Sequence, residues 1–422
     1  MNKILIANRG EIAVRIIRAC KEMNIKTVAV YSEIDKDAMH TKLADEAICI
    51  GPASSNKSYL NFKNIIEAAH ITGADGIHPG FGFLSENSQF AKICEESNIK
   101  FIGPKSEVIN LLGNKSNSKE LMKKEGVPVI PGSEGSIKNL KEAILICEKI
   151  GYPILLKASA GGGGKGIRVV NSFEELETSY NIVKQEAKNA FNDEIQILAD
   201  EHGNVVHLGE RDCSIQRNHQ KIIEETPSTI VDEKLRNKMG NAAIKAVKAA
   251  NYTSCGTVEF LVDDDKKFYF MELNTRIQVE HPITEMRTGI DLVKEQIKIA
   301  AGESLKFKQK EIEFKGHAIE CRINAENPSK NFMPSPGKIN EINLPGGNGV
   351  RIDTAIYDGY VIPPNYDSMI AKIITYGTNR NEAISKMKRS LEELVIDGID
   401  TNRDFLFDII KNQNFIRGNF DT

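Results

Sequence analysis

Two glutamates are the residues of this chain whose types and spacing point most directly to chemistry. Residues 256–273 alternate β-branched or aromatic side chains with other residues on both sides of a polar turn, so they predict a β-hairpin. In that hairpin Glu259 and Glu272 face each other with Cβ atoms ~5 Å apart, where two ionised carboxylates repel by about 3 kcal/mol at an effective dielectric of ~20. The pair therefore predicts a cation or a shared proton between the two carboxylates. The alternative is a solvated outer face of the hairpin.

The residues that follow favour the cation. Asn274 lies two positions beyond Glu272 and adds an amide oxygen, and hard oxygen ligands of this kind suit Mg²⁺ or Mn²⁺ when substrate phosphates complete the shell. If the strand continues, Arg276, Gln278 and Glu280 point the same way as Glu272. Arg276 offers a fork that fits a planar oxyanion, and Glu280 beside it could act as a base. This face predicts a site that joins a metal-bound nucleotide to a small oxyanion.

A glycine-rich segment upstream can supply phosphate contacts. Residues 152–157 and 167–170 read as short strands, and residues 158–166 (ASAGGGGKG) lie between them. The glycines satisfy the dinucleotide-binding fingerprint only formally, because a β-branched strand follows them where that fingerprint requires a helix. The P-loop pattern also fails, since isoleucine and not lysine follows the last glycine. The segment predicts a strand–loop–strand lid that closes over phosphates with Lys157 and Lys165, and the alternative is a flexible linker.

Composition excludes several classes of protein. The chain has 422 residues and a formal net charge of -3, which predicts about three domains and gives no reason to expect nucleic acid or an acidic membrane as a partner. Charged residues interrupt the N-terminal apolar run almost at once, and no apolar run reaches membrane length, so we expect a cytoplasmic protein without a signal peptide. The seven cysteines form no C-x-x-C pair and predict reduced thiols, with Cys213 more often a packing residue than a site residue.

Several stretches, in one order along the whole chain, carry a resemblance to a known family. The chain resembles the biotin carboxylases, which are ATP-grasp enzymes, at residues 3–13, 78–87, 158–166, 210–221, 271–281 and 320–326. The resemblance implies an α/β and α+β fold in three parts. These are an N-terminal Rossmann-like pre-ATP-grasp domain over residues 1–112, an ATP-grasp domain over 113–305 with its glycine-rich lid at about 130–194, and a C-terminal biotin carboxylase domain over 306–422.

The resemblance also implies a role for individual residues. Contacts to ATP would come from Lys115, Lys157, Gly163, Gly164, Lys165, Gln216, His219, Glu259, Leu261 and Glu272. Divalent metal, with two Mg²⁺ or Mn²⁺ ions expected, would be held by Glu259, Glu272 and Asn274. Bicarbonate would be bound by Lys221, Arg276, Gln278 and the backbone of Val279. The catalytic set would be Lys221, Arg276, Glu280 as the base, and Arg322, which would bind biotin and steady its enolate.

The implied activity is the ATP-dependent carboxylation of biotin by bicarbonate. No Met-Lys-Met biotin-attachment segment occurs in the sequence, so biotin is expected on a separate carrier protein. The resemblance further implies carboxyltransferase subunits as partners and a homodimer. Acetyl-CoA carboxylase, in fatty acid synthesis, is the first expected parent complex, and a pyruvate or other acyl-CoA carboxylase is the second. A carbamoyl-phosphate-type ATP-grasp enzyme and a lid-defective, non-catalytic homologue are the alternatives.

Some expectations concern the framework around the site. Residues 4–31 predict a βαβ unit, and the loop residue His78 is expected to fix its loop and not to bind a ligand. A helix over residues 379–394 carries an apolar stripe that predicts core packing. The sequence departs from the family pattern at Asp193–Glu194, where a strand and loop for the adenine are missing, and at its end, Thr422. We expect both departures to reflect omitted stretches, because the chemical residues beyond the gap are intact.

Overall fold

The N-terminal part of the chain forms a parallel sheet covered by helices. The computed structural model describes residues 1–130, 140–152, 154–157, 167–170, 172–176, 191–218, 220–263 and 265–420. Five parallel strands lie in the order β3-β2-β1-β4-β5. Their bounds are β1 Lys3–Ile6, β2 Lys26–Ser32, β3 Glu46–Gly51, β4 Gly76–His78 and β5 Lys100–Phe101. The helices between them are α1 Gly10–Glu22, α2 Met39–Leu43, α3 Phe62–Thr72 and α4 Ser88–Glu96. The predicted βαβ unit is therefore confirmed.

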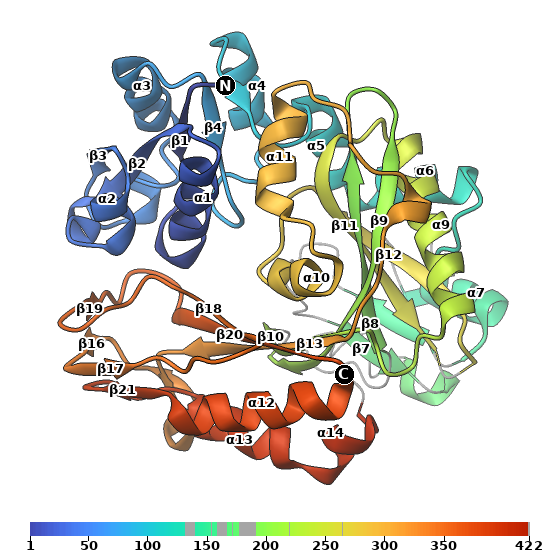
Figure 1. Ribbon diagram of the computed structural model, residues 1–422. Helices are drawn as coiled ribbons and strands as arrows, with labels where there is room; N and C mark the ends of the chain where they lie inside the picture. The colour runs from blue at the N-terminus through green and yellow to red at the C-terminus, as the bar shows by residue number, and fades with distance from the viewer. Residues whose placement is uncertain are drawn as a thin grey trace.

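An eight-stranded sheet runs through the middle and C-terminal parts of the molecule (Figure 1). Its order is β12-β11-β8-β9-β10-β13-β20-β18, and every pairing in it is antiparallel. The strands are β8 Phe191–Ala199, β9 Val205–Arg217, β10 Gln220–Thr226, β11 Ser254–Val262, β12 Phe268–Asn274, β13 His317–Asn324, β18 Val350–Thr354 and β20 Met369–Gly377. The sheet is continuous across the expected start of the C-terminal domain, so side chains of distant segments share one face.

Helices cover this sheet and bury its apolar residues. α5 Ser106–Gly113, α6 Lys115–Lys124 and α9 Glu233–Ala249 pack on the β8, β11 and β12 end. α12 Arg380–Glu393, α13 Arg403–Lys411 and α14 Gln413–Arg417 pack on the β13 and β20 end. The predicted stripe of α12 is confirmed as core, because Ile384, Met387, Leu391 and Leu394 are all buried. α10 His281–Thr288 and α11 Leu292–Ala300 connect the two ends.

The remaining elements are short. They are α7 Leu140–Ile150, the antiparallel pair β6 Ile154–Lys157 and β7 Ile167–Val170, and the strands β14 Glu326–Asn327, β15 Met333–Pro334, β16 Gly337–Lys338, β17 Glu341–Asn343, β19 Val361–Ile362 and β21 Val395–Asp397. The β6–β7 pair confirms the two strands predicted to frame the glycine loop. Among the described residues no helix combines the length and apolar character needed to cross a bilayer. All seven cysteines are free, and only Cys49 is exposed.

One local expectation is wrong. Strand β12 ends at Asn274, and residues 275–280 form bends and a turn in place of the predicted extended strand. The chain must turn there because Glu280 is the N-cap residue of α10, whose second residue is Pro282. Residues 191–194, at the end of the expected lid, begin β8, which pairs along its length with β11.

His78 fixes a loop, as predicted, and gives the fold a pH dependence. The His78 Nδ1 accepts a hydrogen bond from the backbone N–H of Gly80, and the ring is fully buried. Burial, assisted by Arg15, lowers the pKa of His78 to about 3. As pH falls below about 6.5, this histidine takes up a proton in the unfolded chain but stays neutral in the folded chain. The contribution of His78 to the free energy of unfolding is therefore complete above about pH 6.5 and is lost as pH falls toward 3.

Replacing His78 should weaken that dependence. In His78→Asn the side-chain oxygen can still accept from Gly80 but does not titrate. Both proteins should lose stability when the pH is lowered from about 7.5 to about 5.5. The loss in the free energy of unfolding should be smaller in the variant by about 1.4 kcal/mol. Urea denaturation of both proteins at the two pH values measures this difference. If the wild type and the variant showed the same pH dependence, folding would not lower the pKa of His78, and the folded wild type would bind the proton at about pH 5.5.

Candidate active site

The hairpin brings the two predicted metal carboxylates together. Glu259 of β11 pairs with Glu272 of β12, as predicted, and the ladder shifts register directly after this pair. Each carboxylate meets a cation: Lys115 Nζ is 2.9 Å from Glu272 Oε2, and Lys221 Nζ is 3.7 Å from Glu259 Oε1. The Asn274 amide donates a hydrogen bond to Glu259 at 2.6 Å. The repulsion between the two carboxylates is therefore relieved by groups of the protein itself.

Lys221, on β10, lies among three carboxylates. Its Nζ donates to Glu280 Oε1 at 2.8 Å and is paired with Glu194, while Glu259 is the more distant third neighbour. Glu280 receives a second cation, because Arg322 Nη2 lies 2.9 Å from its Oε2. Burial alone would raise the pKa of Glu280, but Lys221 and Arg322 outweigh it and hold that pKa well below its ordinary value. Glu280 is therefore ionised at neutral pH.

The pKa values of the other two members of this cluster, Lys221 and Glu194, are both raised. Burial opposes the charge of Lys221, but Glu194 and Glu280 raise its pKa well above the ordinary value. Burial raises the pKa of Glu194 well above its ordinary value, and Lys221 only partly offsets it. Two carboxylates around one ammonium thus have pKa values moved in opposite directions. Such divergence is typical of sites that transfer protons.

A fully buried guanidinium lies beside the cluster and ties it to two amides. Arg211, on β9, donates to Gln278 Oε1 at 2.5 Å and to Gln196 Oε1 at 2.7 Å. Its Nη2 is also 3.3 Å from Glu194 Oε2. Gln278 in turn donates from Nε2 to Glu259 Oε1 at 3.2 Å. The amide predicted to bind an oxyanion is thus oriented from both of its ends.

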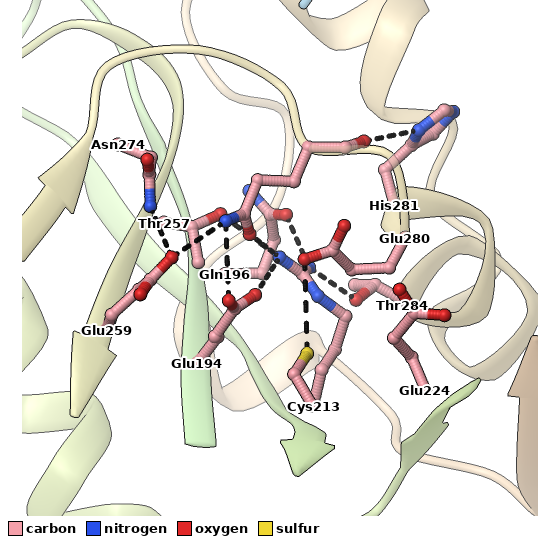
Figure 2. A network of polar contacts seen from close by, with 12 residues as sticks. Glu194, Gln196, Cys213, Glu224, Thr257, Glu259, Asn274, Glu280, His281 and Thr284 are labelled. Atoms are coloured by element: carbon pink, nitrogen blue, oxygen red, sulfur yellow. Dashed lines mark hydrogen bonds and ion pairs between the residues drawn. The ribbon is translucent and has the colours of Figure 1, made fainter. Parts of the chain in front are cut away.

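Sequence analysis did not identify three of these residues as part of the site. Figure 2 shows Glu194 and Gln196, both from β8, pointing into the space between Glu259 and Glu280. A signal was present, because these two polar residues occupy alternate positions, share one face, and are followed by the apolar residues 197–199. Arg211 gave a weaker signal, as a charged residue inside a buried strand.

Arg276 is tied to the N-terminal part of the chain. Its Nε donates to Glu86 Oε2 at 3.0 Å, and its Nη2 lies 3.3 Å from Asn274 Oδ1. Glu86 also accepts from the backbone N–H of Thr275 at 3.3 Å. A cavity of about 230 Å³ opens at this point, and its lining includes Glu86, Lys115, Glu272, Asn274 and Thr275. Lys115, a predicted nucleotide contact, and Glu272 and Asn274, two predicted metal ligands, therefore border this cavity.

Arg322 is held by two carboxylates. Besides Glu280, it binds Glu224 of β10 through Nε at 2.6 Å. Burial raises the pKa of Glu224, although Arg322 acts against it. Glu224 also went unnoticed in the sequence, because its position in a β-branched strand resembles that of an ordinary polar residue. The guanidinium is thereby fixed beside the base predicted for the reaction.

Cys213 lies closer to the site than its expected packing role suggests. Its thiol is buried, and Sγ lies 3.9 Å from Glu280 Oε1. Burial, with a further contribution from Glu194, raises the pKa of the thiol well above its ordinary value. Cys213, Glu194 and Glu280 could in principle hold a metal ion. Because Lys221 already supplies the positive charge there, this trio fits an ammonium better than a metal.

The other predicted residues are distributed as follows. Gln216 is half-buried on β9, where it donates to the Cys213 carbonyl, and Leu261 is half-buried on β11. The half-buried Val279 lies in the turn before α10, and Lys157 ends β6. The predicted contacts that lie outside the described residues are Gly163, Gly164, Lys165 and His219.

The donor set of the hairpin fits a divalent cation. Glu259 and Glu272 provide carboxylate oxygens, and Asn274 provides an amide oxygen, which are the ligands that Mg²⁺ and Mn²⁺ prefer. The Asn274 amide now turns its nitrogen toward Glu259 and its oxygen toward Arg276. Rotation of the amide would present oxygen to an ion between the carboxylates. Lys115 bridges the same hairpin from α6, so it also borders this position.

Comparison with known proteins identifies the family of this chain. Residues 1–109 match the model of the biotin carboxylase N-terminal domain, residues 114–308 that of the carbamoyl-phosphate synthase L chain ATP-binding domain, and residues 320–422 that of the biotin carboxylase C-terminal domain. Biotin carboxylase 1 of Bacillus subtilis is 57% identical over 438 residues, which cover 100% of this chain and 97% of the relative.

Solved structures agree with the sequence matches. A complex of biotin carboxylase with β,γ-ATP from Campylobacter jejuni has a TM-score of 0.95 and 50% identity, and covers 100% of this chain and 97% of its own. The biotin carboxylase domain dimer of Hydrogenobacter thermophilus 2-oxoglutarate carboxylase, with MgADP, ADP and bicarbonate, has a TM-score of 0.93 and 49% identity, and covers 100% and 96%. The chain belongs to the biotin carboxylase family.

Proposed function

We propose that this protein catalyses the ATP-dependent carboxylation of biotin by bicarbonate, the first half-reaction of acetyl-CoA carboxylase in fatty acid synthesis. One observation carries the proposal. Glu280 is buried and ionised between Lys221 and Arg322, and Lys221 also lies 3.7 Å from Glu259, which pairs across the hairpin with the cavity residue Glu272. A nucleotide phosphate at the hairpin and a small oxyanion at the cluster would therefore meet at one place. The ligands named for the two related structures support both halves of this assignment.

In the first step, bicarbonate becomes a nucleophile. Arg276, Gln278, Lys221 and the Val279 backbone N–H would bind its oxygens, and Glu280 would take its proton. The low pKa of Glu280 makes it a weak base before bicarbonate arrives. Bound bicarbonate is a second anion beside Lys221, so the ammonium stabilises the charge of Glu280 less than before. The basicity of Glu280 therefore rises when bicarbonate is bound. An oxygen of the dianion then attacks the γ-phosphorus, and ADP leaves carboxyphosphate behind.

Residues of the hairpin would support that phosphoryl transfer. Glu259, Glu272 and Asn274 would hold two Mg²⁺ or Mn²⁺ ions, which supply charge neutralisation to the phosphates when bound. Lys115 would move from Glu272 to a phosphate oxygen, because a cation between the carboxylates removes its present partner. Lys157, Gly163, Gly164, Lys165, Gln216, His219 and Leu261 remain the proposed ATP contacts on the lid and strand side.

In the second step, carboxyphosphate breaks its C–O bond and gives CO₂ and phosphate. The phosphate removes the proton from the ureido nitrogen of biotin, and the resulting enolate attacks CO₂. Arg322 is the cation proposed for the enolate oxygen, because Glu224 and Glu280 hold its guanidinium at the edge of the bicarbonate site. Bound bicarbonate would weaken the Glu280 contact and release one N–H group of Arg322.

The partners follow from this chemistry. We propose a biotinylated carrier protein as the biotin donor, carboxyltransferase subunits as the next enzymes, a homodimer, and a cytoplasmic location, which the free thiols support. A carboxylase of a 2-oxo acid is the second candidate for the parent complex, because the Hydrogenobacter thermophilus relative belongs to a 2-oxoglutarate carboxylase. Carboxyl-transfer assays with acetyl-CoA and 2-oxo acids as acceptors, each with the matching carboxyltransferase, would separate the two.

Variants of the base and the enolate cation should separate the two steps. Glu280→Gln should lower the bicarbonate-dependent ATPase and biotin carboxylation together, by roughly 100-fold or more, because bicarbonate keeps its proton. Arg322→Gln should lower carboxylation by roughly 100-fold while most of the ATPase remains. Phosphate release and fixation of labelled bicarbonate into biotin measure the two activities. Arg389→Gln, on the exposed side of α12, is the matched control. Equal loss of both activities in folded Arg322→Gln would remove Arg322 from the biotin step.

The metal assignment gives a further expected outcome. Glu272→Gln should leave the fold intact, since it removes repulsion with Glu259, and should abolish turnover of MgATP because a metal ligand is lost. Thermal unfolding and bicarbonate-dependent ATPase measure the two effects. Asp265→Asn, an exposed acidic residue in the turn of the same hairpin, is the control and should keep its activity. A folded Glu272→Gln protein with full activity would disprove the two-carboxylate site.

A further inference from the structure

The turn that carries the proposed base lies outside the strand ladder, and side chains donate hydrogen bonds to two of its carbonyls. Residues 275–280 leave the sheet after β12, so their buried carbonyls need other partners. The Gln278 carbonyl accepts from His281 Nδ1 at 2.9 Å and, at the longer distance of 3.3 Å, from the backbone N–H of His281. The Val279 carbonyl accepts from Lys372 Nζ at 2.7 Å. These carbonyls belong to consecutive peptide groups. The first peptide contains the Val279 N–H, and the second contains the N–H of Glu280.

Lys372 reaches the turn from a distant strand. It lies on β20 directly opposite Arg322 of β13 and Asp353 of β18, so the three side chains share one face of the sheet. Lys372 is fully buried, with Glu11 Oε1 at 3.1 Å and Asp353 Oδ2 at 3.9 Å. Glu11 comes from α1, so the ammonium connects this N-terminal helix, the C-terminal strands and the turn.

His281 is fixed in one tautomer. A carbonyl oxygen can only accept, so Nδ1 must carry the hydrogen that the Gln278 carbonyl receives. Burial, with the nearby positive charges of Lys372, Arg15 and Arg351, holds the pKa of His281 well below its ordinary value. The ring is therefore neutral, and its donor points permanently at the turn.

We propose that Lys372 and His281 are positioning residues that lock the two peptides on either side of Val279. His281 orients the peptide whose N–H would face bicarbonate, and Lys372 orients the peptide that leads into Glu280. This inference rests on the proposed function. Neither residue touches the reacting atoms, and each acts through the backbone that it holds. A purely structural role would make Lys372 only a counter-ion for Glu11 and Asp353.

Matched variants distinguish the two roles of Lys372. The double variant Lys372→Met/Glu11→Gln removes the donor to Val279 without leaving the Glu11 charge unpaired. Glu11→Gln alone is the control, because it keeps that donor. Steady-state ATPase assays at varied bicarbonate and varied ATP give the two KM values, and thermal unfolding reports the fold. We expect the KM for bicarbonate to rise by roughly 10- to 100-fold in the double variant, with the KM for ATP and the stability close to those of the control.

His281 offers an independent test if the Lys372 variant does not fold. His281→Asn keeps an N–H donor at the position of Nδ1, and His281→Leu removes it. The KM for bicarbonate should rise in the leucine variant and recover in the asparagine variant. A bicarbonate KM within about twofold of its control in both folded donor-free variants would overturn this inference alone. A wild-type protein without bicarbonate-dependent ATPase would overturn the proposed function, and the inference with it.

Discussion

The ammonium of Lys221 is the interaction on which the site depends. It lies between the buried carboxylates of Glu194 and Glu280 and near that of Glu259. Without this charge, three acidic groups from β8, β11 and the turn before α10 would repel one another in a region with little water. With it, Glu280 stays ionised while burial keeps the pKa of Glu194 high. Lys221, together with Arg322, thus keeps Glu280 in the ionised form that the proposed chemistry uses.

The fold holds Lys221 and its partners in fixed positions relative to one another. The eight-stranded sheet carries Lys221 on β10, Arg322 on β13 and Lys372 on β20, so three cations approach the same turn from neighbouring strands. The N-terminal part of the chain contributes Glu86, between β4 and α4, which binds Arg276, and Glu11 of α1, which binds Lys372. The site therefore lies where all three expected parts of the chain meet. A displacement of any part would change the position of a charge close to Glu280.

Local periodicity explains which features could be predicted from the sequence. The register of Glu259 and Glu272 followed from two alternating runs and one short turn, because a hairpin leaves few other pairings. The apolar stripe of α12 followed from helical spacing in the same way. The path of residues 275–280 could not be predicted in this way. Their alternating pattern favours a strand, but the chain turns because α10 begins after Glu280. Roles taken from the family resemblance, such as that of Arg322, were not available from spacing at all.

Features that depend on distant segments could not be predicted. The alternation of Glu194 and Gln196 marks a polar face of β8, but the role of Glu194 became clear only when Lys221, 27 positions away, and Arg211 were placed around it. The pair between Arg276 and Glu86 spans 190 positions, and the bond from Lys372 to the Val279 carbonyl spans 93. No pattern in a single sequence reports such contacts. They arise from sheet order and from the need of buried charges and carbonyls for partners.

Transfer of oxygen from bicarbonate to phosphate tests the central claim most directly. Attack of a bicarbonate oxygen on the γ-phosphorus makes a C–O–P link, and its later cleavage between carbon and oxygen leaves that oxygen on phosphorus. With ¹⁸O-labelled bicarbonate, MgATP and biotin, the account predicts inorganic phosphate that carries one ¹⁸O atom from bicarbonate, as measured by mass spectrometry. Phosphate that takes its new oxygen from water, under conditions where biotin is carboxylated, would contradict the account.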